Sequence, residues 1–456
     1  MDVSKTVQSQ RDYFYTDITK SYEFRLDALK RLETAMHQNE GKLFDALQAD
    51  LGKSEQEAYM TEVGLTYGEL RHAIKNLKKW MKPKKVGTPL AHFPSRSVIH
   101  SDPYGVVLVM SPWNYPFFLT MVPVIGAIAA GNCVVVKPSN YSPATSQAIA
   151  DLLQSCYPEN YVATILGGRE QNQDLLKQTF DYIFFTGGLS VGRVVMESAI
   201  PNLTPITLEL GGKSPCIVDK SAPLPLAARR IAFGKFTNTG QTCVAPDYLL
   251  VHSSQKDELA SHLKKEIIEM YGEDTLQNGD YPHIVNKKHF DRLLGLMEGA
   301  NILQGGKSDR QTLKIQPTLL DGVTWDSPVM GEEIFGPLFP ILTYDTLDEV
   351  IATVNSHPKP LALYLFTTDR AVEQRILTSV SYGGGCINDT IIHLANPQLP
   401  FGGVGYSGMG CYHGKDSFDT FTHYKSVLKK ANWLDISMRY APYTKKKYDT
   451  VRRFVK

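Results

Sequence analysis

The spacing of hydrophobic and polar positions changes several times along the chain, and each change predicts a different layer of structure. Residues 8–82 carry apolar side chains at helical spacing, as in YEFRLDALKRLETAMHQNEGKLFDALQADL, and predict several amphipathic helices in an outer layer. Residues 82–101 alternate β-branched and polar positions between prolines. This second pattern favours an exposed hairpin that could pair with another subunit.

A long uncharged stretch follows, from Gly105 to Val136, and its length raises the question of a membrane span. Three prolines argue against a single spanning helix, namely Pro112, Pro116 and Pro123. The pattern instead predicts a strand at 105–110, a loop, a buried helix at 117–131 and a second strand at 133–136.

Short β-rich runs then alternate with helical stretches over most of the chain. The first series contains GVVLVM, NCVVVK, ATIL, YIFFTG and ITLELGG, and predicts a doubly wound parallel sheet with helices on both faces. A second series predicts a helix at 224–238, the strand DYLLVHS, a helix at 256–271 and three further strand-like runs. The chain shows no internal repeat and no long flexible linker, so the prediction is two α/β domains.

Composition fits a globular chain and excludes several classes of protein. A length of 456 residues exceeds the roughly 250–300 residues at which single cores stop growing, which predicts two or three domains. With 43% hydrophobic residues and a net charge of +1, no bulk electrostatic bias toward nucleic acid exists. Six cysteines without a CxxC pair, and a polar N-terminus without a secretory apolar core, predict a cytoplasmic protein with free thiols and no metal site.

Three glycine-rich segments imitate phosphate-binding loops. GGKS occurs at 211–214 and at 305–308, but a P-loop needs a further glycine where these segments have Thr207 and Asn301. The run Gly403–Gly408 matches GxGxxG, yet it follows NPQLPF rather than a strand. A less standard candidate is YIFFTGGLSVG, where a strand runs through Gly187 and Gly192 into a helix, and an ordinary strand-to-helix turn remains the alternative.

Four polar residues are candidates for chemistry, and each has a structural alternative. Lys137 ends a strand at the sheet edge where ligands bind in open α/β folds, although such a lysine is often only solvated. Glu209 lies in a strand that would bury it and raise its pKa, unless a partner pairs with it. Asn114 sits in a proline-bounded loop, and its amide could donate to an oxyanion or brace the loop. Cys243 follows a turn-like Thr-Gly-Gln-Thr run, where a thiol can be a nucleophile or a small buried hydrophobe.

Taken together, the motifs resemble the aldehyde dehydrogenase superfamily over nearly the entire chain. LELGGKSP and GQTC are specific in combination, and Glu209 and Cys243 stand 34 residues apart, the separation of base and nucleophile in that family. PWNYPF and LPFGGVGYSGMGCYHGKDSFDTFTH resemble its class three branch, which includes fatty aldehyde dehydrogenases. The resemblance implies an α/β fold with a Rossmann-type cofactor domain, an α/β catalytic domain and a β oligomerisation arm.

The resemblance also implies a role for each candidate residue. Cys243 would attack the aldehyde, Asn114 and the Cys243 backbone N–H would hold the oxyanion, and Glu209 would activate the water that hydrolyses the thioester. The implied cofactor-binding residues are Trp113, Lys137, Gly187, Gly192, Glu333 and Phe335. Many relatives have Glu three residues after the lysine, whereas this chain has Asn140, so NADP⁺ is expected to serve as well as NAD⁺.

The implied organisation divides the chain into four parts. Residues 1–81 and 102–209 would bind the dinucleotide, 210–395 would form the catalytic domain, 82–101 and 396–430 would form the arm and an active-site loop, and 431–456 a basic tail. A homodimer without a stable membrane anchor is expected.

A CoA-acylating or phosphorylating dehydrogenase is the rival enzyme, but the presence of Glu209 favours water as the acyl acceptor. A non-enzymatic protein on the same fold is the other rival, and it would not require all of Asn114, Glu209, Cys243 and Glu333.

Overall fold

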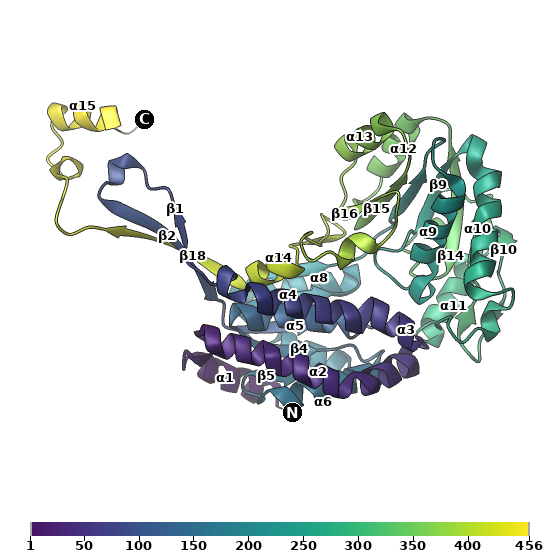
Figure 1. The fold of residues 1–456 in the computed structure, drawn as a ribbon, viewed down its shortest axis with the longest axis horizontal. Coiled ribbons are helices and arrows are strands. Elements are labelled where there is room, and N and C mark those ends of the chain that lie inside the picture. The colour runs from purple at the N-terminus through teal and green to yellow at the C-terminus, as the bar shows by residue number, and fades with distance from the viewer. Residues whose placement is uncertain (1, 455–456) are drawn as a thin grey trace.

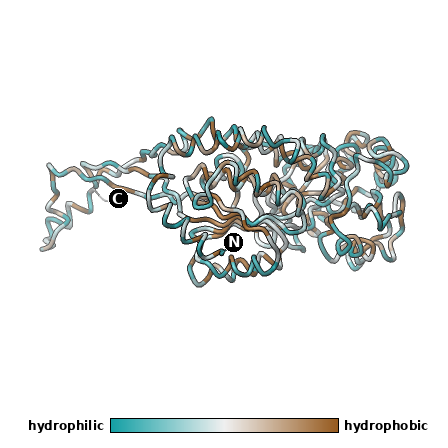
Figure 2. The backbone as a smooth tube through the Cα atoms, turned by 90° about the horizontal axis from the view of Figure 1, so that it is seen from below, coloured by the Kyte–Doolittle hydropathy of each residue, from teal (hydrophilic) through white to brown (hydrophobic). Residues whose placement is uncertain are grey.

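The computed structural model describes residues 2–454, and in this range two large β-sheets form the main body while a smaller sheet projects from it (Figure 1). Residues 1, 455 and 456, which belong to the predicted first and last parts, lie outside the described residues. Hydrophobic segments run through the middle of the main body, and hydrophilic segments follow its outer helices (Figure 2). No helix within the described range is long and apolar enough to cross a membrane.

The first large sheet has the strand order β17-β7-β6-β3-β4-β5 and is parallel except for β17. Its central strands are fully buried because helices cover both faces, which explains their continuous apolar sequences. The strands are β3 (Val106–Met110), β4 (Cys133–Lys137), β5 (Val162–Thr164), β6 (Tyr182–Thr186), β7 (Ile206–Glu209) and β17 (Gly408–Met409).

Helices around this sheet include those predicted from the amphipathic N-terminal region. They are α1 (Val3–Phe14), α2 (Tyr22–Leu51), α3 (Glu55–Ala58), the π-helix η2 (Tyr59–Val63), α4 (Gly64–Trp80), α5 (Phe118–Ala130), α6 (Pro143–Cys156), α7 (Arg169–Leu176) and α8 (Leu189–Ala199). Every residue of α5 is buried, and the helix ends at Gly131, whose φ of 95° is left-handed. The predicted helix and its two flanking strands are therefore confirmed to within a residue or two.

Strand order in the first sheet reverses beside β3. The chain passes from β3 outward to β4 and β5, then crosses back to β6 and β7 on the other side. Loops after β3 and β6 consequently diverge at the carboxyl edge of the sheet. Ligands of open α/β sheets bind at such a switch point.

The second large sheet has the order β10-β13-β14-β9-β8-β15-β16 and is parallel except for β10. Its strands are β8 (Pro215–Val218), β9 (Tyr248–His252), β10 (Asn301–Gln304), β13 (Thr318–Asp321), β14 (Leu338–Tyr344), β15 (Ala362–Phe366) and β16 (Gly384–Ile387). Its helices are α9 (Leu224–Phe236), α10 (Lys256–Tyr271), α11 (Lys287–Leu296), α12 (Leu347–Asn355) and α13 (Arg370–Ser379). A separate two-stranded ribbon joins β11 (Ser308–Asp309) to β12 (Lys314–Ile315).

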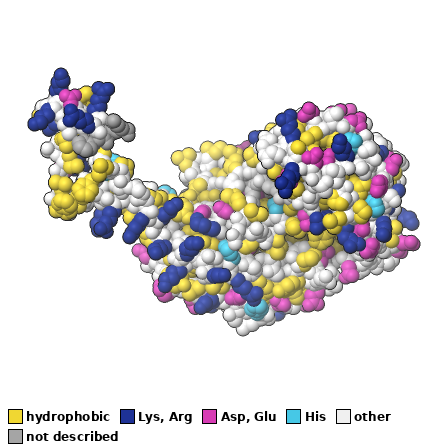
Figure 3. All heavy atoms as spheres, turned by 45° about the horizontal axis from the view of Figure 1, so that its top comes forward, with side chains coloured by type: hydrophobic (Ala, Val, Ile, Leu, Met, Phe, Trp, Pro, Cys, Tyr) yellow, Lys and Arg dark blue, Asp and Glu magenta, His cyan; other side chains and the backbone are white. Residues whose placement is uncertain are grey.

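The projecting sheet has three strands in the order β1-β2-β18, so the predicted hairpin at 82–101 is joined by a strand from the C-terminal segment 396–430 that the resemblance also assigned to the arm. Strands β1 (Lys84–Val86) and β2 (Ser95–Pro103) form that hairpin, and β18 (Thr422–Lys430) pairs with β2 over nine residues. Short helix α14 (Gly414–Thr420) leads into β18, and α15 (Lys445–Phe454) lies beyond it, at the far end of the projection (Figure 1). Basic and hydrophobic side chains gather at that end (Figure 3).

Candidate active site

Cys243 stands in a tight turn that follows α9. The predicted helix at 224–238 is two residues too long, because α9 ends at Phe236 and the next residues leave helical geometry. Asn238, Thr239 and Gly240 all adopt positive φ, at 52°, 56° and 72°. Two consecutive non-glycine residues in this region are strained, and such strain persists only where surrounding contacts hold it.

Hydrogen bonds to distant segments hold this strained turn. The Asn238 N–H donates to Glu57 Oε1 at 2.8 Å, and the Thr239 hydroxyl donates to the Pro282 carbonyl at 2.7 Å. Gln241 donates through Nε2 to the carbonyls of Asn238 and His283, at 3.1 and 3.0 Å. The loop that carries Cys243 is therefore fixed by two separate parts of the chain, at Glu57 and at residues 282–283.

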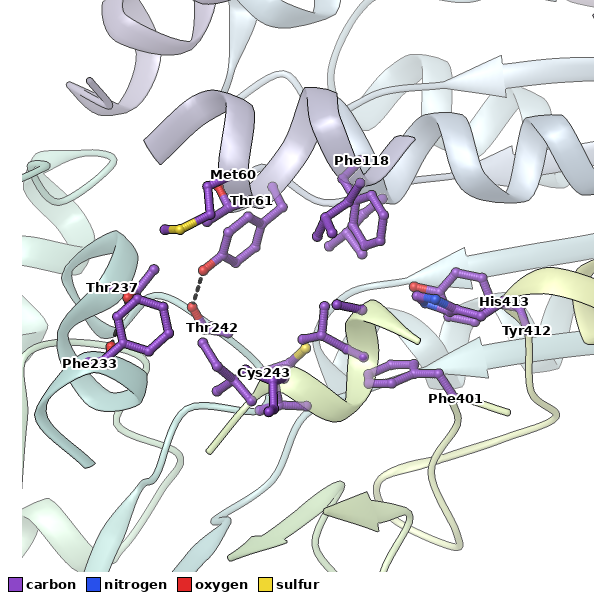
Figure 4. Close-up of a pocket in the computed structure, with 18 residues that line it drawn as sticks. Met60, Thr61, Phe118, Phe233, Thr237, Thr242, Cys243, Phe401, Tyr412 and His413 are labelled. Atoms are coloured by element: carbon purple, nitrogen blue, oxygen red, sulfur yellow. Dashed lines mark hydrogen bonds between the residues drawn. The ribbon is translucent and has the colours of Figure 1, made fainter. Parts of the chain in front are cut away.

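The thiol of Cys243 is partly exposed and faces an apolar cavity of about 310 Å³. In Figure 4 the labelled side chains of Phe118, Phe233, Thr242 and Phe401 lie around its sulfur atom. Burial, followed by the charges of Glu333 and Glu209, raises the pKa of the thiol to about 12. The free thiol therefore holds its proton at neutral pH and needs a proton acceptor to become a nucleophile.

The other cysteines are also free thiols. Interpreting them as small buried residues is correct for Cys133, Cys156 and Cys216 but not for Cys386 and Cys411, which are partly exposed. Neither of these two lines the cavity that Cys243 faces.

Glu209 ends strand β7 and is 2% exposed. Neither of its carboxylate oxygens has a hydrogen-bond partner within residues 2–454, so the paired alternative from the sequence does not apply in this range. Burial raises the pKa of this carboxyl well above its ordinary value. An unpaired buried carboxylate is costly, and the charge of Glu209 contributes to the raised pKa of the Cys243 thiol.

Asn114 lies in the loop between β3 and α5 and is buried. Its side-chain amide donates to the carbonyl of Gln241 at 3.0 Å, two residues before the nucleophile. Only one of the two amide hydrogens is needed for this bond, which leaves a second donor on the same nitrogen. The neighbouring Tyr115 hydroxyl lies 2.6 Å from the Thr242 hydroxyl, so the predicted loop and the nucleophile's turn are in direct contact.

Segments that sequence spacing did not single out form much of the cavity wall. Helices η2 and α4 contribute Met60 and Leu65, and the segment after β16 contributes Ile391 and Leu394. Ile391 lines the wall and has a φ of 49°, which is unusual for a β-branched residue. No periodicity or motif marks these positions, because they meet only in the folded chain.

Lys137 ends β4 and is 3% exposed at the carboxyl edge of the first sheet. Its ammonium donates to the carbonyl of Pro138 at 2.7 Å, and within the described residues no carboxylate pairs with it. Burial lowers the pKa of this ammonium to about 8. Such a cation has donor capacity left for a hydroxyl or phosphate oxygen.

The glycines after β6 do not all have the same structural role. A Cβ on Gly187 would lie 2.6 Å from the Phe185 ring, and one on Gly192 would lie 2.9 Å from Leu210, so both permit close packing of α8. Gly188 instead precedes the first turn of α8 and has open space around it. That open helix N-terminus suits the negative charge of a pyrophosphate.

Glu333 and Phe335 come from the segment before β14, and Phe335 packs against Trp113 of the loop after β3. The Glu333 carboxylate presses against Gly211, where any Cβ would overlap it, and its Oε1 lacks a partner within residues 2–454. Burial, then the charge of Asp247, raises the pKa of Glu333 to about 8. Phe335 packs edge-on against Trp113 with ring centres 5.4 Å apart.

His289 is a member of this aromatic group that the sequence did not reveal. Its ring lies 5.2 Å from that of Trp113. Burial, followed by the neighbouring Arg292 and Lys288, lowers the pKa of His289 to about 4, so it is neutral at pH 7. Within residues 2–454, the Lys137 ammonium without a carboxylate partner, the open Gly188 turn, the unpartnered Glu333 Oε1 and these aromatic rings are groups of the kinds that hydroxyls, a pyrophosphate and a flat ring bind.

Two of the segments that resemble phosphate-binding loops in sequence have structural roles instead. Lys213 of the first GGKS pairs with Asp247 at 2.5 Å and donates to two backbone carbonyls. Gly403–Gly408 forms a turn that leads into β17 rather than into a helix. Among residues 2–454, no three potential ligands are grouped to hold a metal ion.

Comparisons with known proteins agree with this geometry. Residues 1–427 match the family model described as "Aldehyde dehydrogenase family". The chain is 50% identical over its whole length to 4,4'-diaponeurosporen-aldehyde dehydrogenase of Staphylococcus aureus, of which it covers 99%. It is 45% identical, over 94% of this chain and 95% of the relative, to the "Aldehyde dehydrogenase, dimeric NADP-preferring" of Rattus norvegicus.

Among solved structures, the substrate-bound state of Staphylococcus aureus AldH superposes with a TM-score of 0.97 at 50% identity, and the match covers 99% of both chains. A betaine aldehyde dehydrogenase from the same organism, solved with NAD⁺, gives a TM-score of 0.85 at 26% identity, covering 96% of this chain and 88% of that one. The chain belongs to the aldehyde dehydrogenase family. It is an NAD(P)-dependent oxidoreductase of the class three type, and the fold predicted by resemblance is confirmed.

Proposed function

We propose that this enzyme oxidises apolar aldehydes, of medium to long aliphatic or aromatic type, to carboxylic acids through a covalent intermediate on Cys243. One observation carries the proposal. The thiol of Cys243 faces an apolar cavity, and its pKa is raised in part by the charge of Glu209, a buried carboxylate without a hydrogen-bond partner among the described residues. This arrangement supplies a nucleophile, a proton acceptor and a dry binding space at one point.

In the first step the Cys243 sulfur bonds to the aldehyde carbon, the thiol proton passes to the Glu209 carboxylate and from there to solvent, and the carbonyl oxygen becomes an oxyanion. The free amide hydrogen of Asn114 and the backbone N–H of Cys243 are the donors that hold this oxygen. Because Asn114 is itself fixed by the Gln241 carbonyl at 3.0 Å, the donor is oriented before the substrate arrives.

When bound, NAD(P)⁺ would accept the hydride that the thiohemiacetal carbon loses as it becomes a thioester. Glu209 then takes a proton from water, whose oxygen attacks the thioester carbon and releases the acid and the thiol. The raised pKa of Glu209 suits this task, because a carboxylate with a pKa nearer neutrality is a stronger base.

Cofactor binding is assigned to the carboxyl edge of the first sheet and to the segment before β14. Lys137 would donate to the adenosine ribose, and Gly188, between the predicted Gly187 and Gly192, would receive the pyrophosphate at the start of α8. Glu333 would accept from the nicotinamide ribose, while Phe335 and Trp113 flank the ring. Asn140 brings no negative charge to the Lys137 side, and this supports use of NADP⁺ as well as NAD⁺, as in the NADP-preferring relative.

The substrate class follows from the cavity. Its wall is built almost entirely of aliphatic and aromatic side chains, so it favours an aldehyde that carries a long apolar group. The name of the Staphylococcus aureus relative, which acts on a diaponeurosporen aldehyde, supports the same class.

A panel of aldehydes of graded chain length, assayed with both cofactors, tests the proposal. We expect kcat/KM to rise with chain length and product to be the acid without added CoA. Cys243→Ala should fold and bind cofactor yet form no NAD(P)H, while Cys411→Ala, a partly exposed thiol outside the cavity, should keep wild-type activity. Turnover by Cys243→Ala, or a product that contains CoA, contradicts the mechanism.

The organisation of the chain is part of the proposal. Residues 1–81 and 102–209 would bind the dinucleotide and 210–395 would carry the nucleophile, in line with the change of sheet between β7 and β8. The sheet of 82–101 and 422–430 would pair with a second copy to give a homodimer in the cytoplasm, with 431–456 as its basic tail. Strand β17 modifies the predicted arm, because residues 408–409 join the first sheet instead.

A further inference from the structure

A buried ion pair lies behind the nucleophile's loop and has no place in the mechanism above. Lys53 and Glu62 pair at 2.5 Å, and both side chains are 0% exposed. Removing two charges from water costs several kcal/mol per ion, and apolar replacements of such pairs are often neutral or stabilising. Stability alone therefore does not account for this pair.

Glu62 belongs to the π-helix η2, a rare helical form that occurs often at functional sites. Its second oxygen, Oε2, accepts from the backbone N–H groups of Phe117 and Phe118, at 2.8 and 3.2 Å. These are the residues at which the Asn114 loop ends and α5 begins. One carboxylate thus fixes the end of the loop and holds the lysine.

Lys53 acts on the middle of the same loop. Its ammonium donates to the backbone carbonyl of Asn114 at 3.3 Å and lies 4.0 Å from the centre of the Tyr115 ring. The Tyr115 hydroxyl in turn meets the Thr242 hydroxyl at 2.6 Å, next to Cys243. A continuous set of contacts therefore runs from the ion pair to both sides of the predicted oxyanion site.

We propose that Lys53 and Glu62 are positioning residues that hold the side-chain amide of Asn114 in the correct position relative to Cys243. Oxyanion donors must lie within about 0.3 Å of their best distance, and misplacement by about 1 Å costs on the order of 100-fold in rate. The pair touches neither substrate nor cofactor and acts through Asn114. The inference rests on the proposed function, because it assumes that Asn114 is the oxyanion donor.

A double-mutant cycle with Asn114→Ala tests the inference. The neutral variant Lys53→Met/Glu62→Gln leaves no unpaired charge and keeps an acceptor for the Phe117 and Phe118 N–H groups. We expect kcat to fall about 10- to 100-fold while the affinity for NADPH, measured by fluorescence titration, stays within about twofold. In the Asn114→Ala background the same double change should cost less than about threefold, because no donor remains to be positioned.

A second ion pair, which is partly exposed but also receives a backbone N–H, supplies a control. Arg11 pairs with Asp181 at 3.1 Å, and Asp181 also accepts from a backbone N–H, that of Val106, at 2.8 Å. It lies at the amino ends of the strands, opposite to the edge that carries the site. Arg11→Met/Asp181→Asn should lower the melting temperature without changing kcat.

The possible outcomes separate the two ideas. Equal losses of kcat in the wild-type and Asn114→Ala backgrounds would mean that the pair acts by general stability, and this overturns the inference. An Asn114→Ala enzyme with full activity refutes the oxyanion role and with it the proposed mechanism. If the double variant does not fold, Glu62→Gln alone and Lys53→Arg enter the same cycle, and additive losses there also overturn the inference.

Discussion

Replacing Glu333 by Gln should make the enzyme more stable and less active, and the structure gives a size for each effect. Burial beside Asp247 raises the pKa of Glu333 from 4.5 to about 8. Its Oε1 has no partner within the described residues, so the charged form is poorly compensated in the free enzyme. Gln keeps the shape of the side chain but has no carboxyl proton to lose, so the substitution removes the contribution of this group to the pH dependence of stability.

The stability effect depends on pH in a defined direction. Between pH 4.5 and about 8 the folded protein holds the Glu333 proton while the unfolded chain has lost it, so the free energy of unfolding falls as pH rises. At 1.36 kcal/mol per pH unit the upper bound at pH 8 is about 5 kcal/mol. Because the side chain is partly exposed, water screens the charge, and we expect about 2 kcal/mol.

Thermal and urea unfolding at pH 5 and pH 8 measure this effect. Glu333→Gln should exceed wild type in stability at pH 8 and match it closely at pH 5. Cofactor binding should weaken about 10- to 100-fold, since hydrogen bonds to a charged group are worth about 1.5–3 kcal/mol. Glu332→Gln, an exposed neighbour that pairs with Arg292, is the control for both measurements. A stability gain of equal size at both pH values, or unchanged cofactor affinity, refutes the reasoning.

Three further substitutions test individual assignments. Glu209→Gln should lower kcat about 100- to 10,000-fold, the usual contribution of a general base, with unchanged cofactor affinity by equilibrium titration; near-normal turnover contradicts its role. Asn140→Glu should lower the ratio of kcat/KM for NADP⁺ to that for NAD⁺ about tenfold or more through like-charge repulsion, and an unchanged ratio removes this residue from cofactor selection. Lys137→Met should raise KM for both cofactors, whereas equal KM values would place the lysine outside the cofactor site.

The hydrophobic periodicity of the sequence predicts much of the fold. It does not predict the places where the backbone leaves regular helix or strand geometry. Continuous apolar runs identified β3 and β4, and the helix between them, because burial on all sides leaves a plain sequence signal. The end of α9 was missed by two residues, since the left-handed conformation of Asn238 and Thr239 depends on bonds to Glu57 and Pro282. Helix propensity alone carries no information about such partners.

In the candidate active site, too, some residues could be predicted from the sequence and others could not. Cys243, Glu209 and Asn114 were found through motifs, and the structure brings their segments together. His289 and Lys53 were not found, because each acquires its environment from segments far away in the sequence. A lysine in a helical region is normally solvated, and only the folded chain shows that Lys53 has no exposed surface.

The first sheet contains segments that are far apart in the sequence, and strand β17 is the last of its strands to be synthesised. It completes the first sheet beside Glu209, and Asn132, near the start of that sheet, donates to the carbonyl of Phe421, 289 residues later. During synthesis at about 5–20 residues per second, roughly ten seconds or more separate these segments. The first sheet therefore lacks β17 at its β7 edge, and the Phe421 contact of Asn132, until residues up to about 421 have been synthesised.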